Sequence, residues 1–149
     1  MSVVGRSTGQ FVGRLEHFFH RSVTAYPNHV ALERPAISVH GQDVSLTYSE
    51  LDKAAEILAA RIRLFVRPDD IVMLAFPRTD VAAYVALLAV LKSGAAYCAL
   101  DLSFPDDRIR QLIDDASPRF IMTSESLKSR FQEFLEPGLR IFSPEDFRA

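Results

Sequence analysis

From Ile71 onward, short apolar segments alternate with stretches of helical spacing, and this alternation constrains the fold more than any other feature of the sequence. The apolar segments have the length of strands, and the stretches between them are long enough for helices that cross from one parallel strand to the next. The pattern predicts an α/β fold, mainly a parallel sheet with flanking helices. The expected strands are 71–76, 95–100, 120–123 and 139–142, and the expected helices are 81–91, one opened by Pro105 and closed by Pro118, and 125–135.

The first seventy residues follow a different pattern. Residues 11–25 carry apolar side chains at helical spacing and predict an N-terminal helix. The runs 36–39 and 44–46, separated by a Gly-containing segment, predict a small antiparallel hairpin. Thr47, with Glu50 three positions later, has the spacing of a capping box and predicts the start of a further helix.

The helix expected at 81–91 is apolar on every side, yet it falls well short of the roughly 18 residues that a membrane span requires. It is therefore expected to be buried, and Gly94 is placed to end it in a left-handed conformation. A helix that is apolar all round needs cover on all sides. The few other helices and strands expected here would cover some of these sides poorly. We therefore expect the chain to be part of a larger domain or to associate with a partner or a second copy.

Composition limits the possible partners. A formal net charge of −2 with both signs interspersed predicts neither nucleic acid nor membrane as a partner. A single cysteine excludes an internal disulfide and is typical of a reducing, cytoplasmic setting. Residues 1–10 are polar, lack the apolar core of a signal peptide, and are expected to be a flexible N-terminus.

The side chains that could take part in catalysis or metal binding are better explained by structural roles. His17 and His20 lack a third ligand for a metal, and Cys98 lies in an expected buried strand without a positive neighbour. Asp106 and Asp107 suit the first turn of a helix, which leaves Asp101 as the polar residue to examine at a strand exit. Neither G-x-G-x-x-G nor G-x-x-x-x-G-K-[ST] occurs. We therefore predict no catalytic, cofactor-binding or metal-binding residue in this chain.

Two motifs carry a family resemblance. The segment 46–51 reads Leu-Thr-Tyr-Ser-Glu-Leu, and the segment 91–101 reads Leu-Lys-Ser-Gly-Ala-Ala-Tyr-Cys-Ala-Leu-Asp, followed by Phe104-Pro105 and Arg108-Ile109. In this order and spacing they resemble the first two core motifs of the adenylation domains of nonribosomal peptide synthetases, within the adenylate-forming (AMP-binding) enzymes. The family usually has proline where this chain has Ala99 and Leu102. The resemblance extends from about Leu15 to Phe142, and the Ala-Ala-Tyr-x-x-Leu-Asp frame favours the peptide synthetase lineage over the acyl-CoA synthetases.

The resemblance implies that residues 11–149 form the N-terminal part of an adenylation domain and end before its phosphate-binding loop. The intact ligase would use ATP and Mg to convert a carboxylic acid into an acyl-AMP or aminoacyl-AMP. It would then transfer the acyl group to a phosphopantetheine carrier thiol, with release of AMP. This chain would be a scaffold fragment, inactive alone, whose partner is the remainder of the domain or synthetase, in cis or in trans, or a second copy. A non-catalytic interaction module derived from such a domain is the alternative. The missing phosphate loop disfavours an independent flavodoxin-type nucleotide-binding domain.

Overall fold

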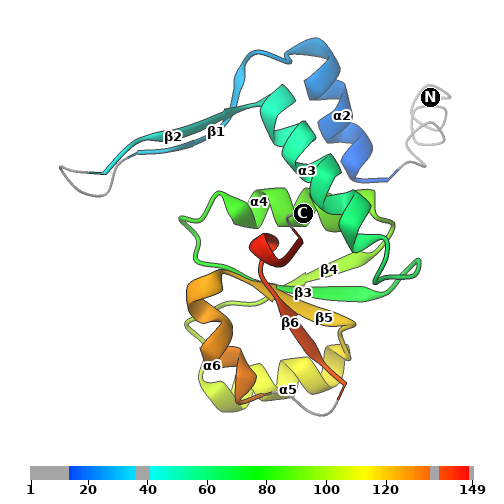
Figure 1. Cartoon of the computed structure of the whole chain (residues 1–149), viewed down its shortest axis with the longest axis vertical. Helices are drawn as coiled ribbons and strands as arrows, with labels where there is room; N and C mark the ends of the chain where they lie inside the picture. The colour runs from blue at the N-terminus through cyan, green and yellow to red at the C-terminus, as the bar shows by residue number, and fades with distance from the viewer. Residues whose placement is uncertain (1–13, 36–40, 135–137, 148–149) are drawn as a thin grey trace, which may run out of the picture.

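The computed structural model describes residues 14–35, 41–134 and 138–147, and within them four strands form a parallel sheet (Figure 1). The strand order is β4-β3-β5-β6, so that β3 and β5 are central. Val72 of β3 lies opposite Tyr97 of β4 on one side and Phe120 of β5 on the other. The predicted α/β architecture with a mainly parallel sheet is confirmed. The strands are β3 (Ile71–Ala75), β4 (Ala96–Ala99), β5 (Phe120–Thr123) and β6 (Arg140–Phe142).

Helices cover both faces of the sheet (Figure 1). On one face lie α4 (Ala82–Lys92), which connects β3 to β4, and α3 (Tyr48–Ile62), which packs on the outer side of α4. On the other face lie α5 (Asp106–Ala116) and the short α6 (Lys128–Gln132). The remaining elements are α2 (Glu16–Ala25) beside α3, the 3-10 turn η1 (Glu125–Leu127) before α6, and η2 (Pro144–Phe147) after β6. Within the described residues, no helix is long and apolar enough to cross a membrane.

Each face of the sheet has its own apolar core, because side chains alternate along a strand. Val72 and Leu74 of β3 pack with Phe120 under α3 and α4. Met73 and Ile121 point the other way and pack with α5 and α6. The run 71–76 is buried on both faces because β3 is central and covered from both sides.

Helix α4 is covered from two sides, because α3 lies across the side that the sheet leaves free. Of its residues, Ala86, Ala89 and Val90 are buried, Tyr84 is exposed and the others are partly exposed. Cover of this apolar helix is therefore incomplete, as the sequence predicts. Gly94 ends the helix as predicted, with a φ of +88°.

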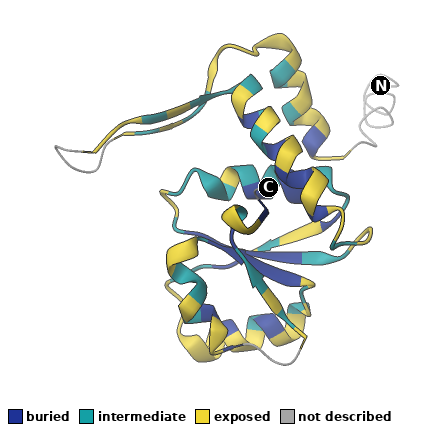
Figure 2. Ribbon diagram, in the orientation of Figure 1, coloured by how far each residue is buried: buried dark blue, intermediate teal, exposed yellow. Residues whose placement is uncertain are grey.

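Strand β4 is less buried than the sequence predicts. It is apolar in sequence and was expected to be buried, yet Ala96, Tyr97 and Ala99 are exposed and Cys98 is only half-buried. Figure 2 shows the contrast with the buried strand β3 beside it. The reason is position, since β4 lies at the edge of the described sheet and has a neighbouring strand on one side alone.

The hairpin is built from a different first strand. β2 (Val44–Thr47) pairs antiparallel with β1 (Val30–Arg34), whereas the sequence predicted 36–39 as its partner. Residues 36–40 lie outside the described residues. The run 30–33 also begins with three apolar residues, so the local pattern did not distinguish the two candidates. The pair extends away from the sheet in Figure 1.

Several helix ends depart slightly from expectation. The Thr47 hydroxyl accepts the Glu50 N–H at 3.1 Å, and the Glu50 carboxylate accepts from that hydroxyl rather than from the Thr47 N–H, which gives half of a capping box. Asp80 caps α4 by accepting the Ala82 N–H at 2.9 Å. Pro105 lies one residue before α5 rather than in its first position. The helix expected at 125–135 is split into η1 and the shorter α6.

Candidate functional site

The carboxyl ends of β3 and β4 border an open cleft of about 350 Å³. This edge of a parallel sheet is where α/β proteins place their ligands. The cleft is mainly apolar, and two charged side chains, Arg78 and Asp101, lie on its wall. The other lining residues are Leu74, Phe76, Pro77, Ala83, Leu87, Ala99, Leu100 and Leu102.

Asp101 organises the turn that leaves β4. Its carboxylate accepts the backbone N–H of Ser103 at 2.9 Å and the Ser103 hydroxyl at 2.7 Å. These bonds, with a smaller contribution from Arg78 at 3.8 Å, lower the pKa of Asp101. The Arg78 side chain is 94% exposed, so this ion pair is weak. Asp101 is therefore at the strand exit that the sequence singled out, but its oxygens are used by the turn.

A second polar cluster lies at the carboxyl ends of β5 and β6, and the sequence did not point to it. Lys128 Nζ lies 2.8 Å from Glu125 Oε2 and 2.6 Å from Asp146 Oδ2. The buried Ser143 donates its hydroxyl to Glu125 at 2.5 Å, and its N–H donates to Asp146 at 2.7 Å. Only the three-residue spacing of Glu125 and Lys128 was visible beforehand, because Ser143 and Asp146 join them through the return of the chain in β6.

The charges in this cluster neutralise one another. Hydrogen bonds to Asp146 and Glu125 raise the pKa of Lys128. Hydrogen bonds from Lys128 and Ser143 lower the pKa of Glu125. Burial opposes the charge of Asp146, but Lys128 and the Ser143 N–H outweigh it and lower its pKa as well. All these groups are held in their charged forms near neutral pH, so none is poised as a general base, and the cluster fastens α6 to the end of β6.

Lys92 and Tyr48 of the two family motifs also serve packing. Lys92 lies in the last turn of α4, and its Nζ is 2.8 Å from both Asp52 and Glu56 of α3. Burial works against the ammonium charge, but the hydrogen bonds to Asp52 and Glu56 prevail and raise the pKa of Lys92. The Tyr48 ring packs 6.0 Å from that of Phe19 on α2.

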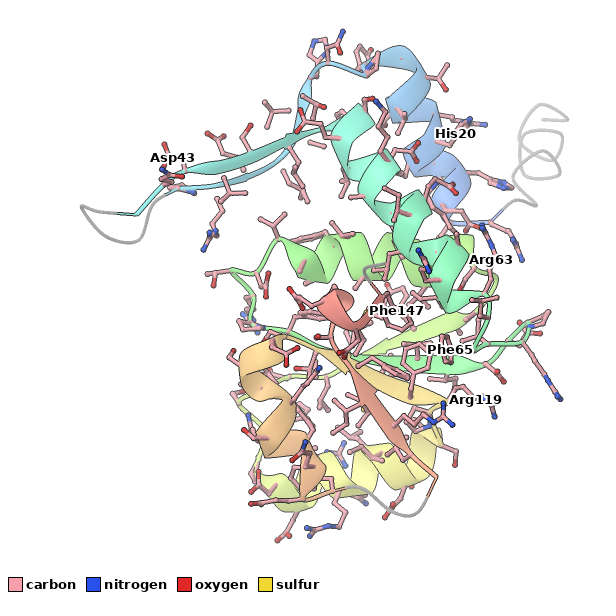
Figure 3. The ribbon with its side chains drawn as sticks, in the orientation of Figure 1. His20, Asp43, Arg63, Phe65, Arg119 and Phe147 are labelled. Atoms are coloured by element: carbon pink, nitrogen blue, oxygen red, sulfur yellow. The ribbon has the colours of Figure 1, made fainter. Side chains whose placement is uncertain are left out.

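The other residues considered from the sequence are not brought together. His17 and His20 are both exposed on α2, and Figure 3 shows His20 on the outer side of that helix. Cys98 packs against the core under α5. Asp106 and Asp107 are exposed in the first turn of α5, with Arg130 and Arg110 respectively at 3.5 Å. His40 lies outside the described residues.

These arrangements do not fit ATP or Mg²⁺. Phosphate binding by an α/β protein needs a loop of free backbone N–H groups at a strand end, and the sequence has no such glycine-rich motif. Among the described residues, no group of three or more His, Cys, Asp or Glu side chains is placed to hold a metal ion. The cleft offers one exposed guanidinium and one carboxylate already bound to its own turn.

Comparison with known proteins gives a consistent result. The family profile described as AMP-binding enzyme matches residues 19–142. The chain is 37% identical over 120 residues to N-(5-amino-5-carboxypentanoyl)-L-cysteinyl-D-valine synthase of Amycolatopsis lactamdurans, covering 79% of this chain and 3% of that protein. It is 45% identical over 100 residues to a dimodular nonribosomal peptide synthase of Bacillus subtilis (strain 168), covering 66% of this chain and 4% of that protein. The chain thus spans only a small part of the length of these relatives.

A solved structure has the same fold. The N-terminal subdomain of Klebsiella oxytoca NpsA, in complex with 3-hydroxybenzoyl-AMSN, matches with a TM-score of 0.73 and 20% sequence identity. The match covers 90% of this chain and 31% of that one. At this identity the likeness shows the fold alone.

Proposed function

Because the chain belongs to the AMP-binding enzyme family and is the N-terminal portion of an adenylation domain, we propose that it is the structural scaffold of an amino-acid-activating site. In this proposal the complete domain forms an aminoacyl-AMP from ATP and a carboxylic acid. It then passes the aminoacyl group to the phosphopantetheine thiol of a carrier protein. ATP, Mg²⁺ and the carrier would be bound by parts of the domain outside this chain.

The observation that carries the proposal is the family match over 19–142, which includes both motifs. The relatives named above are peptide synthases, which supports amino acids as the substrate class. The structure supports a scaffolding role because the carboxylates at this edge and Lys128 are engaged within the fold, which leaves Arg78 as the exposed charge. Asp101 holds its own turn, and Lys128 is shared by Glu125 and Asp146.

The test begins with the purified chain alone. It should show no exchange of pyrophosphate into ATP that depends on a carboxylic acid, and ATP with Mg²⁺ should not raise its melting temperature, since a ligand stabilises only a protein that binds it. Robust exchange by pure material would overturn the scaffold role.

Complementation tests the activating role. The remainder of the adenylation domain of the B. subtilis relative is produced separately and mixed with this chain, with the relative's own N-terminal portion as the positive control. Amino-acid-dependent exchange that needs both pieces would support the proposal. Binding without exchange, where the positive control is active, would favour the non-catalytic interaction module.

A further inference from the structure

Three adjoining clefts form one groove along α3 that ends at β6. The first, of about 360 Å³, shares Arg61 and Phe147 with the second, of about 200 Å³. The second shares Leu64, Phe65 and Phe142 with the third, of about 400 Å³. We name this surface the α3 groove. Its principal lining residues are Ile57, Arg61, Leu64, Phe65, Phe142 and Phe147.

The α3 groove exposes large aliphatic side chains on one line. Ile57 is 68% exposed and Leu64 is 77% exposed, the two highest values among the large hydrophobic side chains that the structure describes. Ile57 and Arg61 are four residues apart on one side of α3, and Leu64 follows in the turn after the helix ends at Ile62. Neither Ile57 nor Leu64 belongs to the apolar core under α3 and α4. Exposed aliphatic side chains next to an apolar cleft are typical of an interface.

The floor of the α3 groove is aromatic and well supported. The Phe65 ring lies 5.4 Å from Phe142 and 5.7 Å from Phe147, and the rings of Phe142 and Phe147 are 5.1 Å apart. Figure 3 shows Phe65 and Phe147 at the end of α3, with Arg119 beside them. Phe120 anchors the cluster in the core below. The groove is therefore formed before anything binds to it.

The charges at the rim are mainly positive. Arg61 and Arg140 have no ion-pair partner among the described residues. Arg119 donates to the Phe65 carbonyl at 3.2 Å, lies 4.0 Å from Asp70 in a loose ion pair, and keeps most of its side chain exposed. Among the described residues that line the groove, Asp146 is the single carboxylate, and it is held by Lys128 at 2.6 Å. An occupant with acidic groups beside its apolar contacts would complement this rim.

The backbone decides between a helix and a strand as the occupant. The α3 backbone groups are already used within the helix, so the length of the groove along α3 offers no row of free N–H and C=O groups to an added strand. At its far end the groove reaches the open edge of β6, which is three residues long and therefore gives an added strand little to pair with. A helix brings its own backbone bonds and can place apolar side chains, three and four residues apart, into the groove.

We propose that the α3 groove docks an amphipathic helix, acidic beside its apolar face, from the part of the adenylation domain that this chain does not span. The chain covers 31% of the matched solved chain, so most of a domain of this fold lies elsewhere. The inference rests on the proposed function for the source of the helix. It is read out by binding, whereas the proposed function is read out by exchange.

The experiment uses the same B. subtilis remainder as the probe and measures its binding to the full chain by titration calorimetry. Ile57→Asp and Leu64→Asp should each weaken binding at least about tenfold, the usual effect of truncating or charging an interface anchor. Both side chains are exposed, so neither variant is expected to unfold, and circular dichroism melting checks this. Leu15→Asp, at a side chain that is 64% exposed on α2, is the matched control and should bind as the wild type does.

A charge variant separates the basic rim from the apolar floor. Arg61→Glu should weaken binding, Arg61→Lys should largely preserve it, and added salt should reduce the difference. Equal affinity for wild type, Ile57→Asp and Leu64→Asp would overturn the inference. So would a failure of the probe to bind this chain when it binds the relative's own N-terminal portion. A dimer of the chain alone that Ile57→Asp dissociates, seen by sedimentation equilibrium, would replace the helix by a second copy. Loss of binding in the variants without exchange in any mixture would uphold the groove and reject the function.

Discussion

The edge position of β4 makes a sharp prediction about proline. The Ala96 N–H donates to Asp70 and the Leu100 N–H donates to Leu74, both at 2.8 Å, so even-numbered residues of this segment direct their N–H toward β3. By the alternation of a strand, the Ala99 N–H points away from β3 to the open edge. Ala99→Pro should therefore remove no hydrogen bond of the sheet, whereas Cys98→Pro should remove one.

The two variants should differ by several kcal/mol. Proline at an exposed edge position restricts the unfolded chain and changes stability by about 1 kcal/mol or less in either direction. At position 98, proline loses a ladder bond worth about 1 kcal/mol and leaves a carbonyl of β3 unpaired in the core, at about 1–3 kcal/mol. Steric conflict within the sheet adds to this, so Cys98→Pro should cost about 3 kcal/mol or more. The family's usual proline at the position of Ala99 is consistent with this assignment.

Urea unfolding followed by circular dichroism measures both variants, with Ala99→Gly and Cys98→Ala as controls for the loss of each side chain. The slope of the transition must match that of the wild type for the midpoints to be compared. If Ala99→Pro is as destabilising as Cys98→Pro, the Ala99 N–H has a partner and β4 is not an edge strand.

Three further outcomes follow from the same geometry. Gly94→Val should lower the unfolding free energy by more than about 1 kcal/mol, because a β-branched residue is strained at this φ. The space around the residue is not the cause, since an added Cβ meets only Arg14 Nη2, at 3.4 Å. An unchanged denaturation midpoint would show that the helix end relaxes. Lys92→Met should cost about 1–3 kcal/mol by leaving Asp52 without its cation. Because the folded pKa of Lys92 lies above its ordinary 10.5, this stabilisation is complete below that pH and is lost as pH rises through the folded pKa, so the variant should show less alkaline destabilisation in pH-dependent melting. The pKa of Asp146 lies below its ordinary 3.8, so its contribution is present above that pH and is lost as pH falls; Lys128→Met should flatten this acid dependence, and an unchanged profile would contradict the pairing.

The sequence alone was sufficient for the class of fold and for the local signals within it. The parallel sheet follows from alternating strands and helices, because consecutive parallel strands have to be joined by crossovers. The left-handed Gly94 and the Thr47 cap are also local, since each depends on backbone groups within a few residues. The two motifs were enough to indicate the family, which the match over 19–142 bears out.

Tertiary structure alone decided which helices and strands pack against one another and which of their residues stay exposed. An apolar strand has the same local pattern whether it becomes central like β3 or an edge like β4, because strand order is set by which side of the sheet each crossover returns to. Local sequence likewise did not determine which strand pairs with β2 or that Ser143 and Asp146 cluster with Lys128. Nor did it determine that Ile57 and Leu64 remain exposed. These features join residues that are distant in sequence, or depend on what covers a residue after folding. Periodicity and capping signals describe only the near neighbours of each residue, and so they do not contain this information.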